Sequence, residues 1–207
     1  MNKLFTGFGK KTHSKKEPVL IVSGLPRSGT SMMMKILIEA GVPTVTDELR
    51  AADTDNPNGY FELETVKQMS DGNVAWLAEA GGKAVKIISS LLEYLPSAYS
   101  YRIIFMEREI REILASQRKM LERRHEKSEV DDAQIAEHFR KHLSVVKPWL
   151  ARQPNMEVLY ISYNSLMLNP EPYCRRVIEF IACEPAHLEQ MLSVPNARLY
   201  RNRTPGS

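Results

Sequence analysis

The feature that most constrains this chain is an apolar run followed at once by a glycine-bounded turn and a helix-forming segment. Residues 19–22 are apolar and rich in β-branched side chains, and Gly24 and Gly29 bracket the turn after them. From Thr30 the residues favour helix until Gly41. A strand that feeds a helix through such a turn aims unpaired backbone N–H groups and the positive end of the helix dipole at one point. The sequence therefore predicts an anion-binding turn suited to phosphate or sulfate.

This turn departs from a Walker A loop at one position. In the pattern G-x-x-x-x-G-K-[ST], Gly24 and Gly29 have the required separation and Ser31 holds the hydroxyl position, but Thr30 stands where the lysine belongs. Without that lysine the turn lacks the cation that NTPases set against the β- and γ-phosphates. Arg27, inside the turn, is the replacement cation, and ATP hydrolysis is disfavoured.

Further apolar runs alternate with segments of helical periodicity. We expect strands at 83–88, 101–106 and 158–161, a short strand at 42–45, a loop or short helix at 89–96, and helices at 62–79, 108–123, 135–149 and 173–182. Alternating strands and helices favour a parallel sheet with right-handed crossovers. The predicted fold class is therefore α/β, a doubly wound parallel sheet of P-loop type flanked by helices.

Length and composition are consistent with a single domain. A chain of 207 residues with 43% hydrophobic and 26% charged residues can build one well-buried α/β domain, which we place at 18–195. We expect a flexible basic arm at 1–17, with transient contact with acidic lipid or polyanion as a minor alternative, and a C-terminal tail at 196–207. A net charge of +3 does not indicate a general nucleic-acid binder.

The hydrophobic pattern and the cysteines indicate the compartment in which the chain would be found. No apolar run is long enough to span a bilayer, so stable membrane insertion is not expected. Cys174 and Cys183 have a spacing that fits no zinc pattern, so we expect two reduced thiols and a cytoplasmic protein.

Three segments resemble motifs of the sulfotransferases that use 3′-phosphoadenosine 5′-phosphosulfate (PAPS). G-L-P-R-S-G-T-S at 24–31 is similar to the 5′-phosphosulfate loop of that family, in its P-R-S-G-T form. Residues 101–121 resemble its second motif, a strand ending in an arginine, here Arg108, followed eight residues later by a helical serine, here Ser116. Residues 157–181 resemble its Y-E-D-L…P segment, with Tyr163 at the tyrosine and Asn164 and Ser165 in place of the acidic pair.

The resemblance implies an enzyme that moves a sulfonyl group in line from PAPS to a hydroxyl or amine of a small molecule or saccharide. The product would be adenosine 3′,5′-bisphosphate (PAP), and no metal would be required. It implies that Arg27 lies against the sulfonate and that Arg108 and Ser116 hold the 3′-phosphate. The donor-binding residues implied are Gly24, Pro26, Arg27, Ser28, Gly29, Thr30, Ser31, Arg108, Ser116 and Tyr163.

The general base is less clearly marked. Cytosolic members of the family place a histidine two residues after a lysine, and here Lys86 matches the lysine while Ile88 stands at the histidine position. Other members use a glutamate, so Glu62, in the N-P-N-G-Y-F-E element at 56–62, and Glu48 are the candidates. Either glutamate could instead be a surface or helix-capping carboxylate, which would turn the search to His125, His138 and His142. Lys86 either donates to the leaving phosphate or only closes its strand.

Two rival functions and the acceptor site complete the predictions. A P-loop nucleotide kinase with a degenerate Walker A loop is one rival, and a non-catalytic nucleotide-binding module is the other. We expect the acceptor to contact residues 46–61 and 122–149. The arginines of the tail either fold over the 3′-phosphate or are disordered.

Overall fold

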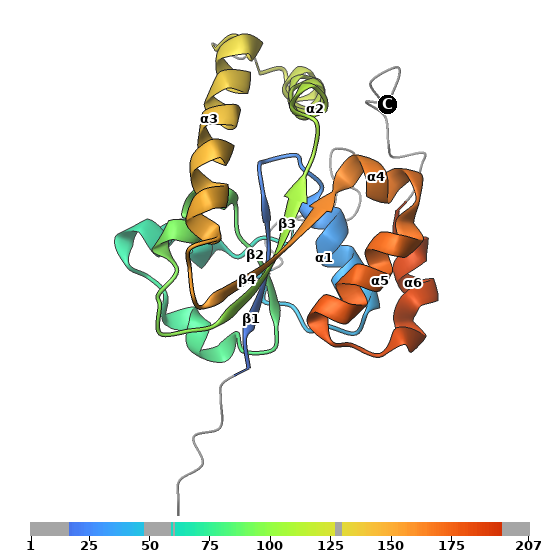
Figure 1. The fold of residues 1–207 in the computed structure, drawn as a ribbon. Coiled ribbons are helices and arrows are strands. Elements are labelled where there is room, and N and C mark those ends of the chain that lie inside the picture. Colours follow the sequence, from blue (N-terminus) through green and yellow to red (C-terminus); the bar gives the residue numbers. More distant parts are fainter. Residues whose placement is uncertain (1–16, 48–58, 60, 127–129, 196–207) are drawn as a thin grey trace, which may run out of the picture.

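A computed structural model describes residues 17–47, 59, 61–126 and 130–195 of the chain (Figure 1). Within these residues one sheet of four strands has the order β2-β1-β3-β4. All three pairings are parallel. The strands are β1 (Val19–Gly24), β2 (Ala84–Lys86), β3 (Tyr101–Glu107) and β4 (Met156–Ser162). The predicted parallel α/β fold is confirmed.

The strand order places a ligand crevice beside β1. The chain runs from β1 to β2 on one side and then crosses to β3 on the other side. Gly24 pairs with Met106, and Glu107 pairs with Ser162, so the carboxyl ends of β1, β3 and β4 meet at one edge. In open α/β sheets, ligands bind outside the carboxyl ends of the strands where the strand order reverses. The turn after Gly24 opens at that point.

Apolar layers cover both faces of the sheet, as a doubly wound fold requires. On β1, Leu20 and Val22 join the core beneath α1 (Thr30–Glu39), α4 (Tyr163–Leu168), α5 (Pro170–Ile181) and α6 (Leu188–Ser193). Val19 and Ile21 point to the opposite core, under the 3₁₀ helices η1 (Glu64–Asp71), η2 (Ala75–Glu79) and η3 (Ser89–Tyr94). Figure 1 shows these two groups on opposite sides of the strands. Because alternate residues of a strand face opposite ways, the apolar residues 19–22 of β1 fill both cores.

Two longer helices, α2 and α3, connect β3 to β4. α2 (Ile110–Arg123) follows β3 directly, and α3 (Asp132–Leu150) leads from the end of α2 back to β4. Asp131 caps α3, since its Oδ2 accepts from the backbone N–H of Ala133 at 3.2 Å. Because α2 follows the carboxyl end of β3, it begins at the edge of the sheet where the site is expected.

Two segments differ from the sequence-based expectation. The helix expected over 62–79 is two 3₁₀ helices, η1 and η2, because Gly72 ends the first in a left-handed conformation with φ 83°. The expected strand at 42–45 is reduced to a single parallel bridge between Thr44 and Ala84. The helix η4 (Pro185–His187) connects α5 to α6.

The structure shows the state of the two cysteines and the character of the helices, which the sequence had linked to the location of the protein. Cys174 and Cys183 are both free, and burial raises the pKa of the Cys174 thiol to about 11. In the part of the chain that the structure describes, no helix has the length and apolar character needed to cross a bilayer. The cytoplasmic location stays a prediction.

Candidate active site

The turn after β1 has a defined backbone shape. The N–H of Ser28 donates to the carbonyl of Leu25 at 3.2 Å, which closes a four-residue turn. Pro26 and Arg27 are its central residues, and Arg27 has φ 66°. Proline followed by a residue with positive φ defines a type II turn, where glycine is the usual second residue. Arginine is strained in this backbone conformation, and strained residues of this kind are often found at functional sites.

The two glycines of the turn are required by close approach. A Cβ atom on Gly24 would lie 2.5 Å from Ser28 Oγ and 2.6 Å from the carbonyl oxygen of Met106. A Cβ on Gly29 would overlap the ring of Tyr163, and Gly29 also has φ 98°. The turn is therefore pressed against the end of β3 on one side and against α4 on the other.

The mouth of this turn presents donors for an anion. The N-cap residue of α1 is Gly29, which has no side chain to cap the helix, and the first helical residues are Thr30 and Ser31. Ser28 is almost completely buried, and within the described residues its Oγ has no hydrogen-bond partner. A buried hydroxyl without a partner is costly. A ligand oxygen at this helix N-terminus would satisfy both Ser28 and the first-turn amides.

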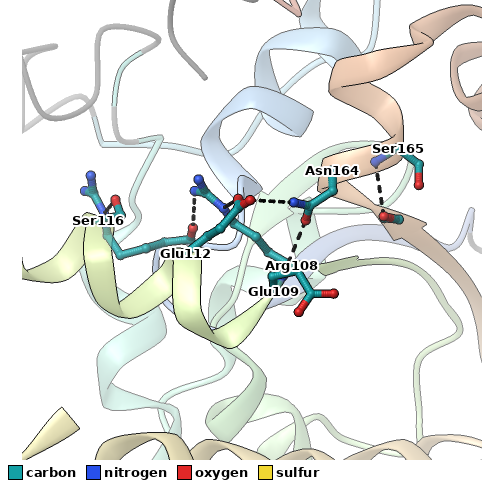
Figure 2. A network of polar contacts seen from close by, with 8 residues as sticks. Arg108, Glu109, Glu112, Ser116, Asn164 and Ser165 are labelled. Carbon is teal, nitrogen blue, oxygen red and sulfur yellow. Dashed lines mark hydrogen bonds and ion pairs between the residues drawn. The ribbon is translucent and has the colours of Figure 1, made fainter. Parts of the chain in front are cut away.

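Arg108 lies at the end of β3 and connects three elements. Its Nε donates to Glu112 Oε2 at 3.1 Å, and its Nη1 donates to the carbonyl oxygen of Arg27 at 3.0 Å. Its guanidinium carbon lies 4.2 Å from the centroid of the Tyr163 ring. Glu112 Oε1 accepts from Asn164 Nδ2 at 2.9 Å, as Figure 2 shows. The side chains of Arg108 and Glu112 are only 8% and 2% exposed, so the cation is fixed in a buried network.

Arg27 reaches the same place from the turn. Its Nε donates to Ser116 Oγ at 3.0 Å, and its Nη1 contacts Met120 Sδ at 3.9 Å. Ser116 lies on α2 and is 9% exposed. The structure thus brings together Arg27, Arg108 and Ser116, although they come from three separate segments.

Tyr163 forms the wall between the turn and Arg108. The pKa of its phenol is raised above the ordinary value, because the effect of burial is larger than the opposing effect of the Arg108 and Arg27 guanidiniums. The neutral ring packs against Gly29 and under the Arg108 guanidinium.

Lys86 and Glu62 face each other at the end of β2. Lys86 Nζ lies 3.7 Å from Glu62 Oε1, and the side chains are 11% and 31% exposed. The carbonyl oxygen of Glu62 accepts from Thr46 Oγ1 at 3.0 Å and from the N–H of Asp47 at 3.2 Å. Ile88 is an exposed apolar side chain. Two of the expected catalytic residues therefore lie side by side, and Glu48 lies outside the described residues.

The candidate histidines are placed differently from one another. His125 is exposed in the turn that follows α2, and His138 is exposed on α3. His142 Nε2 lies 2.8 Å from Ser89 Oγ, and burial lowers the pKa of its imidazole. His142 thus tethers α3 to η3.

Sequence reasoning missed Glu112 as part of the site and gave Asn164 no role of its own. The signal for Glu112 was its spacing of four residues from Arg108 on a helix, which allows an ion pair. Asn164 was seen only as a departure from an acidic pair, yet its side chain also accepts from the N–H of Glu109 at 3.4 Å. The basic arm at 1–16, most of the expected acceptor loop and the tail lie outside the described residues. Within those residues no group of three or more His, Cys, Asp or Glu side chains is arranged to hold a metal ion.

A parallel sheet with a glycine-bounded turn between its first strand and a helix, and with a buried arginine directly after its third strand, defines an α/β protein of P-loop type. Comparison with protein-family models adds the family: residues 17–198 match the sulfotransferase domain. The chain belongs to the sulfotransferase domain family, as the sequence predicted.

Solved structures of sulfotransferases share the fold of this chain. Mouse sulfotransferase SULT7A1 complexed with PAP superimposes with a TM-score of 0.58 at 15% identity, over 92% of this chain and 67% of that one. The sulfotransferase domain from the curacin biosynthetic pathway gives 0.52 at 13% identity, over 94% of each chain. A sulfotransferase from Alicyclobacillus acidocaldarius gives 0.50 at 15% identity, over 90% of this chain and 97% of that one. These likenesses concern the fold, and no curated protein matches the chain.

Proposed function

We propose that this protein transfers a sulfonyl group from PAPS to a hydroxyl or amine acceptor. The observation that carries the proposal is the hydrogen bond from Arg27 to Ser116, at 3.0 Å. This bond joins the turn after β1 to the helix that carries Ser116, beside Arg108. A single nucleotide with phosphates on the 5′ and 3′ positions of its ribose can therefore contact the turn with one phosphate and Arg108 and Ser116 with the other. Family membership and the PAP complex of the mouse enzyme support the choice of donor.

The donor's 5′ end fits the turn. The amides of Ser28–Ser31, the buried Ser28 hydroxyl and the glycine cradle of Gly24 and Gly29 suit an oxyanion. Pro26 sets the turn that orients these donors. PAPS supplies the transferable sulfonyl group, and the protein's part is to hold it in line with an acceptor.

The donor's 3′ end fits Arg108 and Ser116. Arg108 is held by Glu112 and by the Arg27 carbonyl, so its position is set before a ligand arrives. A preorganised guanidinium with a nearby hydroxyl can form charge-assisted hydrogen bonds to a phosphate. Tyr163 gives this end of the site an aromatic wall.

Glu62 is our candidate for the general base, with Lys86 beside it. The acceptor hydroxyl or amine would lose its proton to the Glu62 carboxylate as its oxygen or nitrogen forms the new bond to sulfur. At the same time the bond from sulfur to the phosphate oxygen breaks, and Lys86 would neutralise charge on the leaving phosphate. Glu48 is the alternative base.

The test begins with nucleotide binding. We expect PAP to raise the melting temperature more than adenosine 5′-phosphate, ATP or sulfate at equal concentration, because stabilisation grows with affinity for the folded state. Transfer is then measured from ³⁵S-labelled PAPS to a panel of phenols, alcohols, amines and saccharides. A labelled product confirms the proposal. Tight PAP binding with no product from the panel would favour a non-catalytic nucleotide-binding module, and magnesium-dependent ATP turnover would favour a kinase.

A further inference from the structure

We infer that Asn164, the second residue of α4, is a positioning residue for the 3′-phosphate end of the donor site. It acts through Glu112 on Arg108, the guanidinium that faces this phosphate in the proposed function. The inference rests on the proposed donor and adds to it a residue that acts at a distance from the ligand. Discrimination between nucleotides with and without a 3′-phosphate then depends on the amide of Asn164.

Glu112 is the group that fixes Arg108. Its Oε2 accepts from Arg108 Nε at 3.1 Å, and both side chains are almost completely buried. Arg108 Nη1 donates to the carbonyl oxygen of Arg27 at 3.0 Å. These two contacts set the plane of the guanidinium. Arg108 Nη2 donates to no residue that the structure describes, so this nitrogen remains for a phosphate oxygen.

Asn164 in turn holds Glu112. Its Nδ2 donates to Glu112 Oε1 at 2.9 Å, and its Oδ1 accepts from the N–H of Glu109 at 3.4 Å, as Figure 2 shows. The amide therefore supplies a donor to the carboxylate and an acceptor to the start of α2. A carboxylate at this position could accept from the Glu109 N–H, but it could not donate to Glu112. The contact with Glu112 requires an amide.

α4 gives Asn164 a defined place. Ser162 caps this helix, since its Oγ accepts from the N–H of Ser165 at 3.2 Å. Tyr163, the preceding residue, has its ring centroid 4.2 Å from the guanidinium carbon of Arg108. Two neighbouring residues of α4 thus act on one guanidinium, the first through its ring and the second through the carboxylate partner. This convergence keeps the cation in one position before a ligand binds.

The charge of the cluster explains why a neutral side chain is needed at position 164. Arg108 and Glu112 offset each other, and Asn164 adds a hydrogen bond without adding charge. The 3′-phosphate brings about −1.5 to −2 charges near pH 7. A second carboxylate beside Glu112 would place one more negative charge near that phosphate in a region of low dielectric, which is costly.

The experiment compares PAP with adenosine 5′-phosphate, which lacks only the 3′-phosphate. Dissociation constants are measured by calorimetry for the wild type, Asn164→Asp and Asn155→Asp. Asn155 is the matched control, because its Nδ2 also donates, to the carbonyl oxygen of Tyr99 at 2.8 Å, but at the amino end of the sheet. At about pH 8 we expect Asn164→Asp to weaken PAP by at least about tenfold and adenosine 5′-phosphate by less than about threefold. Asn155→Asp should change both nucleotides equally.

A pH profile separates positioning from a purely structural role. As the pH falls, the new carboxylate and Glu112 take up a shared proton, which restores the donor and the net charge of the wild type. We expect the ratio of the PAP dissociation constants of Asn164→Asp and wild type to fall at least about threefold from about pH 8 to about pH 6. Comparison at equal pH removes the titration of the phosphate itself. A constant ratio would count against the inference.

The charged and titratable groups around this pair come from four elements. Arg108 follows β3, Arg27 lies in the turn after β1, Tyr163 is on α4, and Glu109 precedes α2 with an exposed side chain. Both arginines stay cationic in this range of pH. Tyr163 stays neutral, because burial raises the pKa of its phenol. The pH dependence specific to Asn164→Asp is therefore assigned to the two carboxylates.

A charge exchange provides the second test. In the double variant Asn164→Asp with Glu112→Gln, the glutamine can accept from Arg108 and donate to the new carboxylate, so the cluster again holds one negative charge. We expect the double variant to bind PAP at least about threefold more tightly than Asn164→Asp at about pH 8. Two losses that add would contradict the coupling. Adenosine 5′-phosphate reports on the fold, because a folding defect lowers affinity for both nucleotides.

The outcomes distinguish this inference from the proposed function. If the wild type bound PAP no better than adenosine 5′-phosphate, the proposed donor would fail, and the inference would fail with it. If the wild type preferred PAP and Asn164→Asp kept the same preference at about pH 8, the inference alone would be overturned.

Discussion

The guanidinium carbon of Arg108 lies 4.2 Å from the centroid of the Tyr163 ring, and the same ring fills the space that a Cβ on Gly29 would need. The first residue of α4 thus contacts both the turn after β1 and the arginine that follows β3. These segments are far apart in the sequence, and one aromatic side chain keeps them in register. The site is a packed structure before any ligand is bound, which favours binding without a large ordering cost.

Gly29→Ala tests this packing. The new methyl group would overlap the Tyr163 ring and would hold alanine at φ 98°, so we expect a loss of about 2–4 kcal/mol in the free energy of unfolding. Urea denaturation measures this loss, and PAP should no longer raise the melting temperature.

Gly72→Ala is the matched control for Gly29→Ala. Gly72 has a similar φ of 83°, but among the described residues, its two chain neighbours aside, no atom lies within 4 Å of the position of an added Cβ. Gly72→Ala should lose only the conformational cost of a positive φ, about 1–2 kcal/mol in the free energy of unfolding. Its melting temperature should still rise with PAP. Equal destabilisation by the two substitutions would mean that Tyr163 moves aside freely.

Glu112→Gln tests the buried ion pair. The glutamine side chain has one acceptor oxygen, whereas Glu112 accepts from both Arg108 and Asn164, and the buried guanidinium would lose its counter-charge. Removing one partner of a buried pair costs about 3–5 kcal/mol, and chemical denaturation should show a loss in this range.

Glu157→Gln is the control for Glu112→Gln, since Glu157 pairs with Arg102 at 3.3 Å on an exposed part of the sheet edge. Exposed pairs contribute roughly 0.2–1 kcal/mol. A loss no larger in Glu112→Gln than in Glu157→Gln would show that Arg108 does not depend on Glu112.

The sequence predicted the sheet and the turn well because their signals are local. A short apolar strand, two glycines at a set spacing and a helix are each visible within a few residues of one another. The same holds for the β3–α2 unit that carries Arg108 and Ser116. What was missed depends on the fold: the split of the 62–79 helix follows from Gly72, which periodicity alone did not weigh.

The site was harder to predict wherever a side chain acts at a distance. That Arg27 would meet Ser116 is a contact between residues 89 positions apart, and no spacing rule reveals it. The pairing of Lys86 with Glu62 was likewise hidden, although each was singled out alone. Sequence motifs singled out Arg27 and Ser116 separately, and the packing of α2 against the turn brings the two side chains together.

Glu62→Gln tests the proposed base. Glutamine keeps the shape but cannot take a proton, so we expect kcat to fall by about 10²–10⁴ while the dissociation constant for PAP changes little. Glu64→Gln is the control, because Glu64 is a neighbouring exposed carboxylate that pairs with Lys67 at 2.8 Å. Steady-state rates at saturating donor measure the effect. A rate that survives in Glu62→Gln would transfer the role of base to Glu48. A rate that also survives in Glu48→Gln would point to the histidines.

His142 should make stability depend on pH in a defined direction. Burial is the largest cause of its lowered pKa, with the nearby His138 acting in the same sense and Glu93 opposing it. Because the folded-state pKa of His142 lies below the ordinary histidine value of 6.5, the unfolded chain binds the proton more readily at a pH between these two pKa values. The stability contributed by neutral His142 is therefore full above about pH 6.5 and is lost as the pH falls through the folded-state pKa. One such group adds a slope of at most about 1.4 kcal/mol per pH unit.

His142→Gln should flatten the decline of unfolding free energy below pH 6.5, because it removes the group that titrates. It should also lower stability at pH 8, where the 2.8 Å contact with Ser89 is intact in the wild type. His125→Asn, at an exposed position at the end of α2, should leave the pH profile unchanged. Urea melts at half-unit steps of pH supply the comparison. A His142→Gln profile parallel to that of the wild type would mean that another group controls the acid limb, and that the tether between α3 and η3 does not change with protonation.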